Sequence, residues 1–162
     1  MQTQQGAGNV KVDFWQISSD PVERVVALIA QRVLGSGERM MVVSSDADQL
    51  DLIGKTLWET DPEAFLANGK AGEAGAARQP ILLAQQCSFE NGADSAAENG
   101  ASHVIFADGE WRAEASEFAR SFLLFGENTL EAARACWRSL DGTDDLERSF
   151  FRQDGGKWVK VA

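Results

Sequence analysis

Two aspartates in this chain stand where an open α/β protein could hold a metal ion. Asp46 and Asp48 follow the apolar run 40–43, which predicts a buried strand. Ligands of open α/β sheets bind beyond the carboxyl ends of the strands, and Mg²⁺ prefers carboxylate oxygens. A magnesium-dependent phosphotransferase or hydrolase that uses Asp46 and Asp48 is therefore one hypothesis. We favour the alternative that Asp46 caps the next helix and Asp48 complements its dipole, because no third acidic ligand can be placed.

The sequence gives little support for a phosphate-binding loop. The turn after the first predicted strand reads SSDPVE, without the glycines of a dinucleotide fingerprint. The pair Gly69 and Lys70 lacks the upstream glycine of a phosphate loop, and Ala71 stands where Ser or Thr would hold magnesium. We therefore expect no nucleotide or other cofactor.

Histidine and cysteine offer no better site. His103 is the only histidine and adjoins Ser102 with no evident acid to orient it, so we interpret it as a structural residue at a strand end. Cys87 and Cys136 form no CxxC pair and have no second histidine nearby, which argues against a zinc site or a disulfide framework. The sequence thus favours a protein that is not an enzyme and holds no metal.

The elements that must position these residues follow from apolar periodicity. Apolar or alternating runs predict strands at 10–17, 40–43, 80–84, 103–107 and 120–125, and a period near 3.6 predicts helices over 20–35, 46–58, 110–118 and 127–140, the first with Asp20 as its N-cap. Residues 68–77 and 85–102 have loop composition, and a turn at 154–156 predicts a hairpin of strands 149–152 and 157–161. This order predicts a three-layer, Rossmann-like α/β fold, with a mostly parallel sheet, helices on both faces and a C-terminal antiparallel hairpin.

Length and composition favour a single domain. The chain has 162 residues, 44% of them hydrophobic, which is enough for a sizeable core. We expect 1–9 to be a flexible leader and 10–162 one α/β domain. Because 25 acidic residues outnumber 15 basic ones, the net charge of −10 argues against direct binding to nucleic acid. The start resembles no signal peptide and no apolar run could span a bilayer, so we expect a cytoplasmic protein without membrane contact.

Two large aromatic residues flank a connection that has few apolar residues of its own. Leu50, Ile53, Leu57 and Trp58 form the inner stripe of the predicted second helix, and Phe65 follows in a turn. Trp58 and Phe65 either reach back into the core or face a partner, because Trp and Phe are frequent anchors of protein interfaces. The residue chemistry alone leaves both alternatives open.

Basic residues gather toward the end of this acidic chain. Arg134 and Arg138 lie four apart on one edge of the last predicted helix. Segment 146–162 has only Glu147 and Asp154 as acidic residues, against four basic ones: Arg148, Arg152, Lys157 and Lys160. Such side chains are usually only solvated, but this local excess could receive an acidic peptide.

Four segments carry a family resemblance: LWETDPEAFLANGKAGEAGAARQPILL, NGASHVIFADG, LEAARACWRSL and RSFFRQDGGKWVKVA. The most specific feature is a Leu-Trp pair followed by a Phe-Leu pair and a glycine-rich loop. In order and spacing, over 13–162, these segments resemble the chi subunit of bacterial DNA polymerase III, in the form found in alphaproteobacteria.

The resemblance implies a Rossmann-like fold that binds no nucleotide, in a non-catalytic accessory subunit of the clamp-loader complex. It also implies that a basic, partly apolar pocket near the last long helix binds the acidic C-terminal tail of the single-stranded DNA-binding protein (SSB). Arg134 matches the arginine of that pocket, and Leu123 is the nearest match for its apolar wall. Further positive charge is expected from Arg138, Arg148 or Arg152.

A second partner is implied as well. Family members contact the psi subunit or a helicase through an aromatic pair that matches Trp58 and Phe65. The chain is thereby predicted to be an adaptor of the replication machinery that reaches DNA only indirectly, through SSB. We expect the tail to bind with micromolar affinity, about −8 kcal/mol, and more weakly as salt is added.

Overall fold

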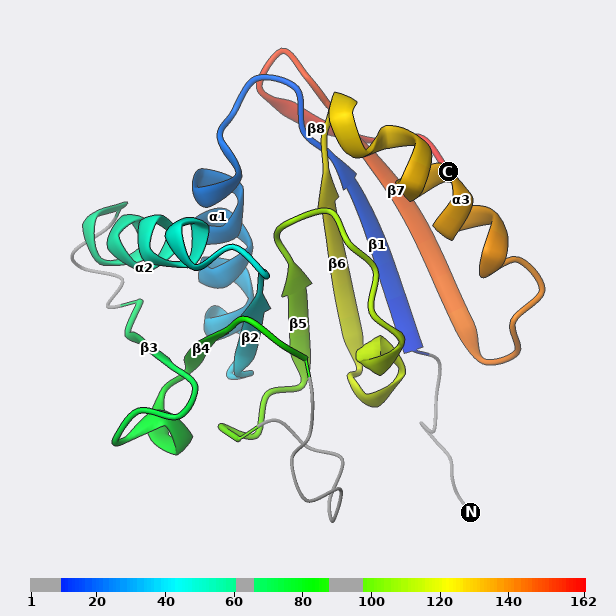
Figure 1. Cartoon of the computed structure of the whole chain (residues 1–162). Helices are drawn as coiled ribbons and strands as arrows, with labels where there is room; N and C mark the ends of the chain where they lie inside the picture. The colour runs from blue at the N-terminus through cyan, green and yellow to red at the C-terminus, as the bar shows by residue number, and fades with distance from the viewer. Residues whose placement is uncertain (1–9, 61–65, 88–97) are drawn as a thin grey trace.

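The chain folds around a sheet with strands in the order β3-β4-β2-β5-β6-β1-β7-β8 (Figure 1). The computed structural model describes residues 10–60, 66–87 and 98–162. Neighbouring strands are parallel except β7 and β8, which pair antiparallel. This topology confirms the predicted mostly parallel α/β fold with a C-terminal hairpin. The predicted leader, 1–9, lies outside the described residues.

The elements have the following bounds. The strands are β1 (Val10–Gln16), β2 (Met40–Val43), β3 (Asn68–Lys70), β4 (Ile81–Ala84), β5 (His103–Phe106), β6 (Arg120–Phe125), β7 (Leu146–Asp154) and β8 (Lys157–Lys160). The α-helices are α1 (Val22–Gly35), α2 (Ala47–Thr60) and α3 (Leu130–Ser139), and short 3-10 helices span Ala76–Arg78, Ala113–Glu117 and Glu127–Thr129.

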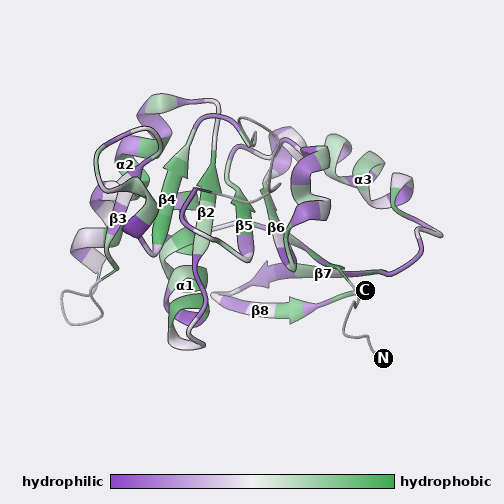
Figure 2. Cartoon of the chain, turned by 90° about the horizontal axis from the view of Figure 1, so that it is seen from below, coloured by the Kyte–Doolittle hydropathy of each residue, from purple (hydrophilic) through white to green (hydrophobic). Residues whose placement is uncertain are grey.

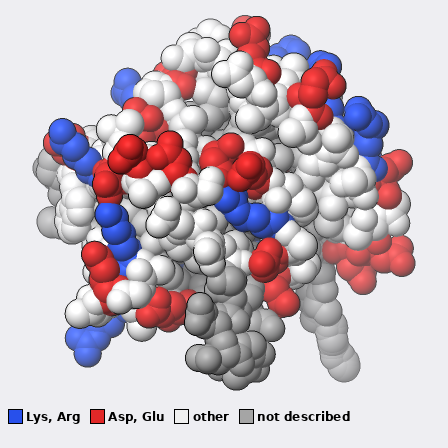
Figure 3. All heavy atoms as spheres, in the orientation of Figure 1, with Lys and Arg blue, Asp and Glu red and all other residues white. Residues whose placement is uncertain are grey.

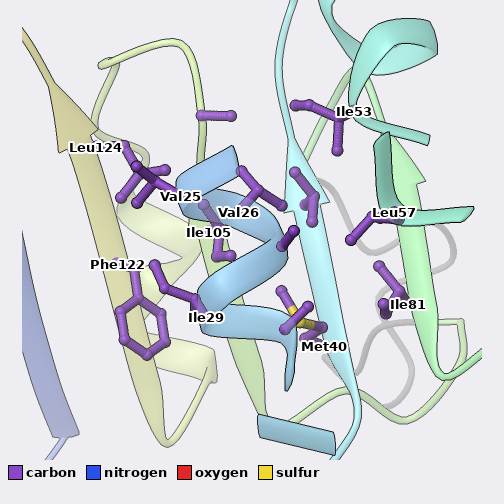
Figure 4. Close-up of a cluster of buried hydrophobic side chains, with 14 of the residues drawn as sticks. Val25, Val26, Ile29, Met40, Ile53, Leu57, Ile81, Ile105, Phe122 and Leu124 are labelled. Atoms are coloured by element: carbon purple, nitrogen blue, oxygen red, sulfur yellow. The ribbon is translucent and has the colours of Figure 1, made fainter. Parts of the chain in front are cut away.

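Helices α1 and α2 cover one face of the sheet. The apolar stripe of α1, predicted from its period, is buried against the strands, and Ile53 and Leu57 of α2 pack beside it (Figure 4). The strand residues of this cluster include Met40, Ile81, Ile105, Phe122 and Leu124. Strands β2 and β4 contribute residues to the buried clusters on both faces, so they are buried at every position, as their continuous apolar sequences predict (Figure 2).

Helix α3 covers the opposite face, over β6, β1 and β7. Its Ala133 and Cys136 join a second buried cluster that contains Phe14, Phe106 and Leu123. Ala115, in the connection between β5 and β6, packs into the same cluster. On the face that α1 and α2 cover, β7 and β8 extend the sheet beyond α1.

The start of α1 differs from the prediction. Asp20 is not the N-cap: Pro21 occupies that position, and no side chain caps the helix. Asp20 instead accepts a hydrogen bond from Nε2 of Gln153 (2.8 Å), whose Oε1 accepts the backbone N–H groups of Ser18 and Ser19 at 3.1 and 3.0 Å. A buried side chain of β7 thus satisfies the backbone of the β1–α1 turn and binds the Asp20 carboxylate, which does not cap the helix.

Three other expectations need correction. Residues 68–77 are not only a loop, because 68–70 pair with β4 as a short edge strand and 76–78 form a 3-10 turn. The predicted helix over 110–118 is reduced to the 3-10 turn at 113–117, and the predicted helix from 127 becomes α-helical only at Leu130. In the described part of the chain, no helix is long and apolar enough to cross a membrane.

Candidate functional site

A hollow of about 270 Å³ opens between α3 and the β7–β8 hairpin. Its lining comes from both, and we call it the α3–hairpin hollow: Arg134, Trp137, Arg138, Phe150, Val161 and Ala162. The three α3 residues share one side of the helix because they are three and four positions apart. Phe150 lies on the face of β7 that α3 covers, and Val161 is 45% exposed. Apolar side chains therefore form the walls, and two guanidinium groups stand beside them.

An aromatic cluster holds this wall in place. Phe14 is fully buried in β1 and meets Trp137 edge to face at 5.2 Å between ring centroids. Phe150 stacks parallel to Phe14 at 6.3 Å and meets Trp137 at 5.8 Å. Phe125 completes the cluster, 5.5 Å from Phe150. Such pairs add about 0.5–1.5 kcal/mol each beyond their buried area, so the cluster stabilises the apolar side of the hollow.

The two lining arginines are available to an anion. Arg134 lies 3.3 Å from Glu131 one turn earlier, but both side chains are more than half exposed, so water screens this pair. Arg138 forms no ion pair within the described ranges. On the face shown in Figure 3, basic and acidic side chains both lie over α3, and further acidic ones gather where α3 leads into β7. A carboxylate at the hollow would thus meet positive charge.

The other predicted pocket residues lie elsewhere. Arg148 stacks over the Trp137 ring at 4.1 Å, donates a hydrogen bond to the Trp137 carbonyl and pairs with Asp141 at 2.8 Å, so it braces the wall. Arg152 is exposed on the same face of β7 and does not line the hollow. Leu123 is fully buried and borders a different depression, beside Trp111, so its side chain does not reach the hollow.

Sequence reasoning missed the apolar lining from the hairpin. Phe150 and Val161 belong to the quoted segment RSFFRQDGGKWVKVA, but the segment does not show which of its residues face α3. Alternation along β7 was the available signal, because it places Arg148, Phe150 and Arg152 on one side. Alternation does not reveal the strand register between β7 and β1, which places Phe150 next to Phe14.

At the carboxyl edge of the sheet, Asp46 is a helix cap. Its Oδ1 accepts the backbone N–H groups of Asp48 and Gln49 at 3.0 and 3.3 Å, which confirms the favoured interpretation. No group of three or more His, Cys, Asp or Glu residues that could hold a metal ion occurs in the described ranges. The two aspartates of the magnesium hypothesis therefore have no third ligand there.

Asp108, which the sequence did not single out, occupies the crevice at this edge, between β2 and β5. Its Oδ2 accepts the backbone N–H of Ser45 at 2.9 Å, and its two oxygens pair with the guanidinium of Arg112 at 2.9 and 2.7 Å. Burial alone would raise the pKa of Asp108, but hydrogen bonds from Arg112 and from the Ser45 and Glu110 N–H groups outweigh it and lower the pKa. The carboxylate stands where open α/β proteins place their ligands, and it is already paired with Arg112.

His103, Cys87 and Cys136 have surroundings that are typical of structural residues. Ser102 Oγ donates to Glu38 at 2.6 Å and lies 2.8 Å from His103 Nδ1, so the acid contacts the serine and does not orient the histidine. Burial lowers the pKa of His103 and raises the pKa of the buried Cys87 and Cys136 thiols to about 11. At neutral pH these thiols are protonated and weakly nucleophilic.

Trp58 is 55% exposed at the end of α2, although Leu50, Ile53 and Leu57 of the same predicted stripe are buried. Assigning Trp58 to the inner stripe was therefore wrong. The geometric reason is that Trp58 follows Leu57 by one position, which is a rotation of about 100° around the helix. Phe65 lies outside the described residues.

The fold recurs in a solved structure. The crystal structure of T4 UvsW matches with a TM-score of 0.62 and 10% sequence identity, over 89% of this chain and 41% of that chain. The chain thus spans less than half the length of that protein, and the likeness concerns the fold alone. A search of curated protein sequences found no significant match.

A family profile matches most of the chain. The profile describes the DNA polymerase III chi subunit, HolC, and it matches residues 10–144, from β1 through α3. Its range includes both lining arginines, and the β7–β8 hairpin lies beyond it. The agreement extends over most of the sheet and all three α-helices, so the chain belongs to the family of DNA polymerase III chi subunits.

Proposed function

We propose that this chi-family chain is a non-catalytic adaptor of the clamp-loader assembly that binds the acidic C-terminal tail of SSB in the α3–hairpin hollow. The observation that carries the proposal is the composition of that hollow. Two guanidinium groups adjoin an apolar floor of Trp137 and Phe150 in a chain whose net charge is −10. An acidic tail that ends in an apolar residue and a free carboxylate has the complementary chemistry.

Each part of the tail has a counterpart. The terminal side chain packs on Phe150, Trp137 and Val161, which belong to the apolar part of the lining. Arg134 or Arg138 pairs with the terminal carboxylate through two parallel N–H···O bonds, a geometry that lysine cannot offer. The acidic residues before the end meet the basic side chains of the hairpin, among them Arg152. The acidic body of the protein repels bare DNA, so the tail is the route to single strands.

Arg134→Ala is expected to weaken tail binding about tenfold or more, because a hydrogen bond to a charged group contributes about 1.5–3 kcal/mol. Calorimetry with a synthetic peptide, in which a run of aspartates precedes a C-terminal phenylalanine, measures the effect. Arg138→Ala should act in the same direction, and the affinity of both variants should depend less on salt than that of the wild type.

Arg24→Ala is the matched control. Arg24 is also an exposed arginine, on α1, across the sheet from the hollow, and its loss should leave the peptide Kd unchanged. No measurable heat with the wild-type protein would refute the proposed function. Equal losses in Arg24→Ala and Arg134→Ala would reduce the interaction to general charge attraction and refute the assigned pocket.

The exposed indole of Trp58 is proposed as a contact for the second partner, the psi subunit or a helicase, together with Phe65. Replacing Trp58 by Ala should leave the free energy of unfolding within about 0.5 kcal/mol, because the side chain is exposed. It should also leave tail binding intact but weaken partner binding by about 2 kcal/mol or more. Surface plasmon resonance with each candidate partner checks this, with Glu59→Ala as the neighbouring control. Unchanged affinity for both partners would exclude Trp58 from the interface.

A protein with these interactions works in the cytoplasm, associated with the nucleoid only through the replication machinery. The chain contributes binding energy and no reacting group. At the carboxyl edge of the sheet, Asp108 is already paired to Arg112 and accepts the Ser45 N–H, which gives its carboxylate a structural role.

A further inference from the structure

The hairpin strand β8 has an open edge. It is the last strand in the sheet order, and no strand of the described chain pairs with its outer side. Gly155 and Gly156 form the turn, both at positive φ (57° and 83°), so Asp154 and Lys157 close a two-residue hairpin. Hydrogen-bonded and outward-facing residues alternate along an antiparallel strand. The backbone N–H and C=O groups of Trp158 and Lys160 therefore point away from β7.

This open edge leads into the α3–hairpin hollow. Val161 N–H and Ala162 N–H both donate to the carbonyl of Phe150, at 2.8 and 3.4 Å, and Phe150 N–H donates to the carbonyl of Ala162 at 3.0 Å. Two residues opposite one is a β-bulge, which twists the strand and ends regular pairing. Val161 and Ala162 are also lining residues, so the free edge and the hollow are continuous.

Charge along the edge favours one kind of occupant. Lys157 and Lys160 are exposed and form no ion pair with any described residue. Register pairs Lys160 with Phe151 and Lys157 with Asp154, so the two lysines lie on opposite faces of the sheet. Arg152 lies opposite Val159, on the face of the hollow. Side chains of an added strand also alternate between the faces, so acidic residues would meet a basic side chain on either one.

We infer that β8 receives the acidic tail by strand addition, with the tail residues before the apolar end running along the open edge, parallel to β8. This inference rests on the proposed function, because the tail must end in the hollow. The direction follows from geometry: β8 itself runs from Lys157 toward Val161 at the hollow, and the tail must run the same way to end there. Four strand residues span about 13 Å, at about 3.3 Å each, which matches a short run of aspartates.

Backbone methylation of the peptide tests the inference. A series of otherwise identical peptides, each with a run of aspartates before a C-terminal phenylalanine, carries one N-methyl group at successive positions. In an added strand, the N–H of every second peptide residue points at β8. Methylating one of these N–H groups should weaken binding about tenfold, and methylating an N–H that points away from β8 should weaken it by less than about twofold. Side-chain charges are identical throughout the series, which separates strand pairing from charge attraction.

Hydrogen exchange supplies the protein's side of the test. Bound peptide should slow amide exchange at Lys160 and Trp158 about tenfold or more, and leave Val159, already bonded to β7, nearly unchanged. A methylation effect that does not alternate, with no protection at Lys160, would overturn strand addition while Arg134-dependent binding still supports the proposed function. Failure of the unmethylated peptide to bind the wild-type protein would overturn both.

Discussion

Asp108→Ala is expected to lower the free energy of unfolding by about 3 kcal/mol. The substitution leaves the Arg112 guanidinium, whose side chain is only 16% exposed, without its carboxylate. An unpaired buried charge is among the most destabilising defects a single substitution can produce. It also removes the acceptor for the Ser45 and Glu110 N–H groups. Urea unfolding at neutral pH, followed by circular dichroism, measures the loss.

Two further variants test whether the lost ion pair causes the lower stability of Asp108→Ala. Glu110→Ala removes a carboxylate that lies 3.7 Å from Arg112 but is 67% exposed. This substitution should lower the free energy of unfolding by less than about 0.5 kcal/mol. Asp108→Asn keeps the shape but loses the charge. Because the folded pKa of Asp108 is lowered, its contribution is fully present above the unfolded pKa and is lost as pH falls through the folded pKa. The stability gap between wild type and Asp108→Asn should therefore close in acid, and a constant gap would contradict the ion pair.

Phe14→Ala should cost about 3–5 kcal/mol of stability and weaken tail binding as well. Phe14 is fully buried, and its ring contacts Trp137 and Phe150, so truncation leaves a cavity below the α3–hairpin hollow. The residue does not line the hollow, and any loss of affinity would come from displaced walls. Thermal unfolding gives the stability change, and calorimetry on the folded fraction gives the Kd.

A conservative variant and a surface variant complete the experiment. Phe14→Leu keeps most of the volume and should lose less than half as much stability as Phe14→Ala. Val159→Ala, at a position that is 41% exposed, should be nearly neutral for stability. If Phe14→Ala destabilises the protein but binds the peptide with wild-type affinity, the aromatic cluster supports the fold without shaping the site.

Periodicity was sufficient for most elements of this fold. Apolar runs located β2, β4, β5 and β6, and the 3.6-residue pattern located α1, α2 and α3. The failures occur where a local sequence depends on distant partners. Residues 68–70 pair as a strand with β4, and the Asp20 carboxylate binds Gln153, over a hundred positions later, instead of capping α1. Neither partner is visible in a local pattern.

In the candidate site, too, the residues that could be predicted are those whose positions depend on local sequence. Arg134 and Arg138 were identifiable because both lie on one helix, where spacing fixes their relative positions. Phe150 and Val161 were not, because their place depends on the register of β7 with β1 and on the bulge that follows β8. Arg148 was expected to bind the tail, yet its guanidinium lies on Trp137, a contact that sequence spacing does not reveal.

The position of β1 has a consequence for synthesis. Its neighbours are β6 and β7, and Gln153 binds the turn after β1 across 133 to 135 positions of sequence. As the ribosome releases the chain from its N-terminal end, β1 has no neighbouring strand until β6 emerges, and its second edge is open until β7 does. Closing such distant pairs is slow, so the α3–hairpin hollow, which needs β7, is completed late. A nascent chain therefore lacks the α3–hairpin hollow until β7 and β8 have been released.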